Sequence, residues 1–418
     1  MNKYIGKVKI DPNKNHISAD ILCRMYFPLD YKQAVIYMHN NLEIEKIESK
    51  EIERVSYGPK SDESIPFIQE GRKVFLDIDE SKRTSEMVSI SMKYSGEITK
   101  IGQSGINRIE KHWVELGIYA PWFPLEENFP EANFEIDVEF TEDNYVLIGS
   151  PNIKKNGKNY KIEIKKSFSD CSFVASDKFV DQKIEIINGD NKVLIYYIDE
   201  KNEKSARKLG KQVKVIIDYY TECFGEIENS DYTIAIVPRG NGEDGGGYNR
   251  PGFVVLPDID DIGSSSHVKY GNDEYYAFKY LAHELAHLWW HGADPKTWED
   301  WLNESFAEYS SLMALEKLAG KNIFDKKIDE YEKISEKLNS IWGIERDDDD
   351  AFDLLYVKGP YLIHKLKMKI GKEGFLTLTR SMHSKNIVTT NDFLKEVKNI
   401  AGENIANDFE YNLKNINR

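Results

Sequence analysis

Residues 275–290 read YYAFKYLAHELAHLWW, a stretch without glycine or proline that predicts an α-helix. On a helix, His283 and His287 lie one turn apart on the same face, so both imidazoles can bind one metal ion. Glu284 is offset from them by about 100°, which places its carboxylate beside the metal, where a general base belongs. A chance HExxH is expected in roughly one such chain in fifty, so the motif needs a third ligand to support it.

That ligand follows in the next predicted helix, which spans 301–320 and reads WLNESFAEYSSLMALEKLAG. Sixteen residues, including a proline-containing turn, separate His287 from Glu304, whose carboxylate can reach back to the metal. Catalytic zinc usually has three protein ligands and an open position for water, so we predict one Zn²⁺ per chain, held by His283, His287 and Glu304. Glu308 lies on the same helix face and could orient a ligand histidine; the alternative is a solvated surface glutamate.

The first half of the chain predicts β structure. Residues 1–198 contain many short, partly alternating segments rich in Val, Ile, Tyr and Phe, separated by turn formers such as DPNKN and NGDN. This spacing favours an antiparallel saddle or sandwich. Near Asp199 the apolar spacing becomes helical, first in SARKLGKQVKVIIDYYTECFG, which ends on Gly225, and from Tyr275 it stays helical almost to the end. We therefore predict an α+β chain with two domains, 1–198 and 199–418.

Composition excludes several classes of partner. The net charge of −15 argues against nucleic acid, because phosphate binding requires clustered Lys and Arg. No apolar run approaches the ~18 to 20 residues that span a bilayer. No signal peptide is visible in MNKYIGKVKI, so we expect a cytoplasmic protein unless a leader was removed. Cys23, Cys171 and Cys223 are odd in number and widely spaced, which predicts buried or incidental thiols.

Three segments of the sequence resemble one enzyme family. HELAHLWW followed by WLNESFAEY is similar to the HELAHQWW…WLNEGFA signature of the gluzincin aminopeptidases, the family of membrane alanyl aminopeptidase and leukotriene A4 hydrolase. Residues 119–140 and 354–375 resemble the family's FPCFDEP…ATF segment and its Y-x-K-G helix. The resemblance implies a thermolysin-like, mainly helical catalytic domain after the β domain, with Glu304 as third zinc ligand. The turn before Glu304 is two residues shorter than usual.

The same resemblance implies further site residues. Tyr356 matches the tyrosine that stabilises the tetrahedral intermediate, which requires a donor aimed at the oxyanion on the face opposite Glu284. The alternative for Tyr356 is a place in the core. Lys358, in the same motif, is expected to be structural or solvated. The family's substrate strand, G-A/G-M-E-N, corresponds here to Gly246, Gly247, Tyr248 and Asn249.

Asn249 stands where the family has the glutamate that holds the substrate's α-amino group. An extended peptide can still pair with the backbone of this strand, but the carboxylate is missing. Glu243, Asp244 or Glu115 of the β domain could replace it. The large C-terminal helical domain of the family is also missing, which implies an open cleft or one closed by a second copy or another partner chain.

Other residues of interest are expected to lie outside the chemistry. His291 is too far along its helix to bind the metal and should orient a neighbour or lie on the surface. Trp289, Trp290, Trp298 and Trp301 are expected in the core. The Asp347–Asp350 run predicts a solvated loop, which could also lie at the cleft rim and attract basic substrates.

These observations together predict a zinc-dependent peptidase with a peptide substrate, and the resemblance favours an aminopeptidase. Three alternatives stay open. An endopeptidase or oligopeptidase would suit an open cleft without an amine anchor. Another zinc hydrolase could use the same constellation, for example on an epoxide. A peptide-binding protein with a relict site is disfavoured, because ligands, base and tyrosine are all present.

Overall fold

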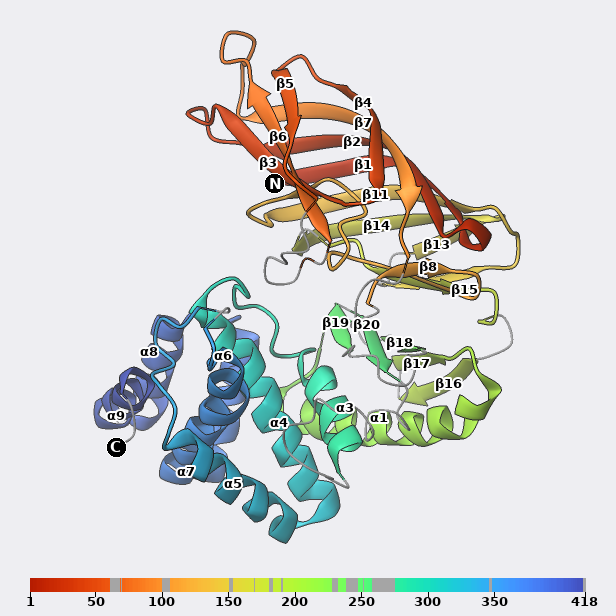
Figure 1. Ribbon diagram of the computed structural model, residues 1–418. Coiled ribbons are helices and arrows are strands. Elements are labelled where there is room, and N and C mark those ends of the chain that lie inside the picture. Colours follow the sequence, from red (N-terminus) through yellow and green to blue (C-terminus); the bar gives the residue numbers. More distant parts are fainter. Residues whose placement is uncertain are drawn as a thin grey trace.

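Figure 1 shows the computed structural model, in which a β-rich N-terminal part lies above a largely helical C-terminal part, as predicted for an α+β chain. The structure describes residues 1–60, 68, 70–99, 106–149, 153–168, 170–179, 183–188, 191–227, 232–237, 247–250, 252–257, 275–345 and 348–415.

A seven-stranded sheet forms the broad upper layer. It contains β1 (Asn2–Asp11), β2 (His16–Tyr26), β4 (Leu42–Glu48), β7 (Met87–Glu97), β11 (Glu131–Phe140), β13 (Ile153–Asn156) and β14 (Asn159–Phe168). Their order is β13-β14-β11-β1-β2-β7-β4. Neighbouring strands are antiparallel except for β1 and β11, which pair in parallel from Asn2↔Ala132 to Ile10↔Phe140. The sheet is therefore mixed, and its first strand lies in the middle.

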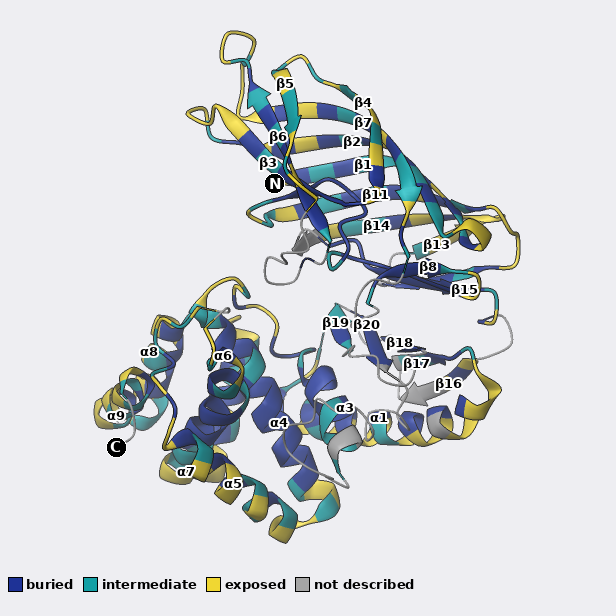
Figure 2. Ribbon diagram, in the orientation of Figure 1, coloured by how far each residue is buried: buried dark blue, intermediate teal, exposed yellow. Residues whose placement is uncertain are grey.

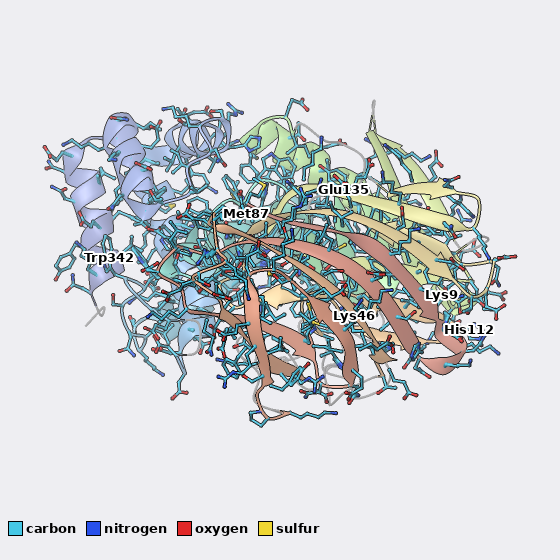
Figure 3. The ribbon with its side chains drawn as sticks, turned by 90° about the horizontal axis from the view of Figure 1, so that it is seen from above. Lys9, Lys46, Met87, His112, Glu135 and Trp342 are labelled. Atoms are coloured by element: carbon cyan, nitrogen blue, oxygen red, sulfur yellow. The ribbon has the colours of Figure 1, made fainter. Side chains whose placement is uncertain are left out.

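Buried and more exposed residues alternate along the strands, so the two faces of this sheet differ. In β2, every second residue from Ile17 to Met25 is buried, and the residues between them are more exposed. Figure 2 shows this alternation as dark and light bands along the strands. Charged residues cover the opposite face, where Figure 3 shows Lys9, Lys46 and Glu135 from above. The buried face therefore looks toward the rest of the β-rich part.

Two smaller sheets complete this part. One has the order β10-β3-β6-β5 and contains β3 (Gln33–His39), β5 (Ile52–Tyr57), β6 (Gly71–Ile78) and β10 (Leu125–Glu126). The other has the order β12-β15-β9-β8 and contains β8 (Arg108–Glu110), β9 (Trp113–Leu116), β12 (Val146–Gly149) and β15 (Phe173–Ser176). Side chains from all three sheets share one core, which includes Trp122 and Phe123 from the segment between β9 and β10.

A five-stranded sheet connects the two parts of the chain. It contains β16 (Lys183–Asn188), β17 (Asn191–Tyr196), β18 (Tyr232–Val237), β19 (Tyr248–Arg250) and β20 (Phe253–Pro257), in the order β16-β17-β18-β20-β19. Helix α1 (Glu203–Phe224) packs against it and ends at Gly225, whose φ of 102° is accessible mainly to glycine. The predicted boundary at 198 falls between β17 and β18 of this sheet, and the division into domains stays a prediction.

Helices build the rest of the C-terminal part. They are α3 (Tyr276–Ala286), α4 (Trp301–Ala319), α5 (Lys321–Ser335), α6 (Ala351–Asp353), a π-helical segment (Leu354–Lys358), α7 (Gly359–Ser384), α8 (Thr390–Ala401) and α9 (Glu403–Lys414). Short 3-10 turns lie at Pro12–Lys14, Glu200–Asn202 and Trp298–Asp300. Helix α4 is the central one, because its residues are buried almost continuously from Trp301 to Leu315. Among the described helices, none has the length and apolar character needed to cross a bilayer.

The five-stranded sheet also packs against the β-rich part. Trp113 and Val174, from β9 and β15, share a small core with Tyr248 and Phe253, from β19 and β20. Asp170 forms an ion pair with Arg250 at the same junction. The strand that the sequence assigns to substrate binding is therefore supported from both parts of the chain.

Candidate active site

Helices α3 and α4 bring His283, His287 and Glu304 together. Helix α3 ends at Ala286, four residues before the end of the predicted helical stretch, but His287 keeps helical backbone angles (φ −61°, ψ −10°). The one-turn spacing of the two histidines is therefore preserved. Elsewhere in the described part of the chain, no other set of three His, Cys, Asp or Glu side chains is arranged to hold a metal ion.

The distances among these three side chains fit a zinc ion. The two Nε2 atoms of His283 and His287 lie 3.2 Å apart, and Glu304 Oε2 lies 3.3 Å from the first and 3.6 Å from the second. Bond lengths of about 2.05 Å in a tetrahedral site require ligand atoms about 3.3 Å apart. The triangle formed by the two Nε2 atoms and Glu304 Oε2 has sides close to this length, so the three atoms can bind one Zn²⁺.

Hydrogen bonds on the far side of each imidazole fix its orientation. His287 Nδ1 lies 2.9 Å from the Trp290 carbonyl oxygen, which can only accept, so Nδ1 donates and Nε2 offers its lone pair. His283 Nδ1 lies 3.1 Å from Glu308 Oε2, the arrangement expected of a carboxylate that orients a metal ligand. Glu308 is buried, so its alternative as a solvated surface residue does not apply.

Glu308 belongs to a polar network that the sequence did not indicate. Its Oε1 accepts hydrogen bonds from the Lys279 ammonium and the Tyr331 hydroxyl, and these two donors lie 2.9 Å apart. Burial raises the pKa of Glu308, but Lys279 and His283 outweigh burial and hold the pKa well below its usual range. Burial lowers the pKa of His283, while hydrogen bonds with Glu304 and Glu308 outweigh it and bring that pKa to about 10.

Asn303, the residue before Glu304, stabilises the short connection between α3 and α4. Its side chain exchanges two hydrogen bonds with the backbone of Ala293, at 3.0 and 2.9 Å, and donates to Asp300 at 2.8 Å. The Asn303 side chain therefore holds the loop against the start of α4 and so fixes the backbone position of Glu304. This gives the Asn of the WLNE motif a structural role.

Glu284 lies next to the three candidate ligands and is buried. Burial raises its pKa, whereas the neighbouring imidazoles and a hydrogen bond with Tyr280 act in the opposite direction. A carboxylate that is less acidic than usual is better suited to hold a proton during the reaction.

Tyr356 lies in the π-helical segment, and its ring stacks on His283 with the ring centres 5.5 Å apart. Its other face stacks on Phe352 at 4.5 Å. The ring therefore lies against a candidate ligand rather than deep in the core. Single π turns within helices often occur at functional sites. Lys358 is fully buried and donates to the carbonyl oxygens of Asn339 and Asn415, so it is structural.

The candidate substrate strand is β19, an edge strand of the five-stranded sheet. Asn249 does not project freely into solution, because its Nδ2 donates to the backbone carbonyl of Glu284 at 2.9 Å. Tyr248 is buried and packs toward the β-rich part. Gly247 precedes the strand, whereas Gly246, like the candidate anchors Glu243 and Asp244, lies outside the described residues.

The remaining candidates lie away from the metal ligands. Glu115 is fully buried, and its Oε2 accepts from the Trp113 indole at 3.0 Å. His291 is exposed and contacts the His287 carbonyl at 2.8 Å, outside the ligand set. Trp289, Trp290 and Trp301 are buried, and Trp298 packs against the same core. Asp348–Asp350 lie near the surface, and Asp347 is not among the described residues.

Sequence reasoning missed Lys279, Tyr280, Tyr331 and Arg250. Tyr280 precedes Glu284 by four residues, so helical spacing already placed both on one face. The same spacing relates Lys279 to His283. Tyr331 and Arg250 carry no comparable signal, because each meets its partner only through tertiary packing.

Comparison with known proteins found a matching family model and solved structures of similar fold. Residues 262–411 match the family model described as the peptidase family M1 domain. An M1 zinc metallopeptidase from Deinococcus radiodurans, a mutant bound to a Tyr-Ser-Ala substrate, superposes with a TM-score of 0.64 at 14% identity, covering 99% of this chain and 94% of that one. Native yeast LTA4 hydrolase superposes with a TM-score of 0.70 at 16% identity, covering 99% of this chain and 67% of the other. No curated protein sequence matches significantly. At such identities the two structures establish the fold.

Proposed function

We propose that this chain, which belongs to peptidase family M1 and is a zinc metallopeptidase, removes residues from the N-termini of peptides. The observation that carries the proposal is the triangle of His283, His287 and Glu304, whose size fits one zinc ion, with Glu284 beside it. The structure of the Deinococcus relative with a Tyr-Ser-Ala substrate supports a short peptide as the substrate class.

Each of these groups has a separate role in amide hydrolysis. A zinc ion held by the three ligands would polarise the scissile carbonyl and lower the pKa of a water molecule. Glu284 takes the proton from the attacking water and later delivers it to the leaving amine. The Tyr356 hydroxyl donates to the oxyanion, and the β19 edge pairs with the extended peptide. Glu308 and the Trp290 carbonyl keep both imidazoles in place.

Metal analysis and one variant test this function. Protein purified without added metal should contain about one zinc per chain, and its peptide hydrolysis should vanish with a chelator and return with Zn²⁺. Glu284→Gln should keep the zinc and lose at least ~10²-fold in turnover. Glu316→Gln, farther along α4 and facing Lys367, is the matched control. A Glu284→Gln variant as active as this control would remove Glu284 from the mechanism.

A specific observation favours an endopeptidase as the second candidate. The side-chain amide of Asn249 donates to the backbone carbonyl of Glu284. Glu115 is fully buried and accepts a hydrogen bond from the Trp113 indole. Neither group offers a free negative charge to a substrate ammonium, and an unpaired charge in a desolvated subsite is costly. Digestion of a peptide library, read by mass spectrometry, separates the two candidates. Single-residue release from the N-terminus supports the aminopeptidase, and internal cleavage supports the endopeptidase.

A further inference from the structure

The π-helical segment that carries Tyr356 leaves the carbonyl of buried Leu355 without a donor from its own helix. The Gly359 N–H donates to the Leu354 carbonyl, five residues earlier in the sequence. In an α-helix the same N–H would bind the Leu355 carbonyl instead. In a π register the donor to Leu355 would be residue 360, but Pro360 has no N–H. Because buried carbonyls are almost always paired, the Leu355 carbonyl requires a donor from another element.

Ser305 of α4 supplies that donor. Its hydroxyl donates to the Leu355 carbonyl oxygen at 2.6 Å, and both residues are buried. The approach requires glycine at position 359, because a Cβ atom there would overlap the Ser305 hydroxyl and lie 2.6 Å from the Ser305 Cβ atom. Helix α4 and the π-helical segment are therefore in close contact at this point, and a buried hydrogen bond joins them.

This hydrogen bond connects two groups of the candidate active site through short covalent paths. Ser305 directly follows Glu304, the third candidate zinc ligand. The Leu355 carbonyl belongs to the peptide bond that leads into Tyr356, and this peptide unit is planar and stiff. A donor that fixes the carbonyl oxygen therefore also fixes the backbone direction of Tyr356, whose ring stacks on His283 with the ring centres 5.5 Å apart.

We infer that Ser305 is a positioning residue that holds the Tyr356 hydroxyl in place relative to the zinc ligands. An oxyanion donor must lie about 2.7–3.1 Å from the developing charge, so a small displacement of the π-helical segment weakens its effect. The Ser305 hydroxyl limits that displacement, because it ties the segment to the helix that carries Glu304. The inference rests on the proposed function, since it presumes that Tyr356 donates to the oxyanion.

A separate contact holds the same segment in the fold. The Lys358 ammonium donates to the backbone carbonyl oxygens of Asn339, in the loop after α5, and of Asn415, just after α9. Removing the Ser305 hydroxyl should therefore shift Tyr356 relative to the metal without releasing the segment. The candidate substrate strand β19 belongs to the five-stranded sheet and should not move. This predicts a fall in kcat at a nearly constant KM.

The test compares Ser305→Ala with Ser335→Ala. The control also removes a fully buried serine hydroxyl that donates to a backbone carbonyl at 2.6 Å, but it does so within α5, to Tyr331 one turn earlier. Alanine favours helix, so both variants should keep the fold. We expect Ser305→Ala to lower kcat about fivefold and to leave KM within about twofold. Zinc content and thermal unfolding should equal those of the control.

A double variant shows whether Ser305 acts through Tyr356. Once Tyr356→Phe has removed the hydroxyl that is positioned, adding Ser305→Ala should lower kcat no further. A second fivefold loss would overturn the inference, because it would place the effect at another group, such as Glu304. A loss of zinc, a rise in KM that accounts for the whole effect, or kinetic constants equal to those of Ser335→Ala would also overturn it.

Tyr356→Phe, measured alone, separates the inference from the proposed function. If Tyr356→Phe is impaired and Ser305→Ala is normal, the inference alone fails. If Tyr356→Phe is as active as wild type, the proposed role of Tyr356 fails, and the inference fails with it.

Discussion

Glu308→Gln should weaken zinc binding by about 10- to 100-fold without unfolding the protein. The carboxylate accepts from three donors: Lys279 and Tyr331 on Oε1, and His283 on Oε2. A glutamine of the same shape has one accepting oxygen and one donating NH₂ group. Whichever way the amide is placed, the NH₂ group faces donors on one side.

The size of the effect follows from this mismatch. If the amide oxygen faces His283, the NH₂ group meets the Lys279 ammonium, and two donors oppose each other in a buried place. If the amide is flipped, the NH₂ group faces Nδ1 of His283 and the histidine loses the acceptor that orients it. A hydrogen bond to a charged group contributes about 1.5–3 kcal/mol, which corresponds to the expected change in zinc affinity.

The assay is competition for zinc with a chelator of known affinity, at a fixed pH, for wild type and variant. Glu316→Gln serves again as the control, because it removes one negative charge from the same helix away from the ligands. Circular dichroism of the metal-free proteins checks that the fold is kept. Equal zinc affinity for Glu308→Gln and Glu316→Gln would refute the claim that Glu308 orients His283 for the metal.

Three further results are expected. Tyr356→Phe should lower kcat at least ~10-fold and leave zinc content and substrate binding largely intact, since the hydroxyl acts mainly in the transition state; steady-state kinetics and metal analysis check this. A peptide with a free N-terminus should be preferred over its acetylated form by less than ~10³-fold in kcat/KM, because Asn249 carries no charge, and a larger ratio would indicate another anchor. His39 is fully buried, and burial lowers its pKa to about 4. The unfolded chain, with an ordinary histidine pKa near 6.5, then binds the proton more readily. Stability should therefore fall by up to about 3 kcal/mol from pH 6.5 to 4, and urea unfolding of wild type against His39→Gln measures the difference.

Helical spacing explains why much of the candidate site was predictable. The i, i+4 relation sets the directions of His283 and His287 within one helix, and of Glu304 and Glu308 within another. No knowledge of tertiary structure is needed for these pairs. The α+β class is predictable for a similar reason, because strand and helix periods are local properties of the chain.

Contacts between distant segments are not predictable in this way. The parallel pairing of β1 with β11 joins strands that are far apart in the sequence, and no local sequence pattern predicts which distant strands become neighbours. The Asn249 side chain donates to the carbonyl of Glu284, a partner that it meets only once β19 packs on α3. The same holds for Tyr331, which reaches Glu308 from another helix. The π-helical turn around Tyr356 adds a backbone irregularity that side-chain spacing does not reveal.

The five-stranded sheet has a consequence for dissecting the protein. A fragment that starts at 199 would lack β16 and β17, and would expose the long edge of β18 that normally pairs with β17. It would also lose Trp113 and Val174, which cover the other side of β19 and β20. Uncovered strand edges beside apolar surface are prone to intermolecular pairing. Such a fragment should aggregate. A fragment that begins at Lys183 also lacks Trp113 and Val174, but it keeps all five strands paired and should therefore aggregate less.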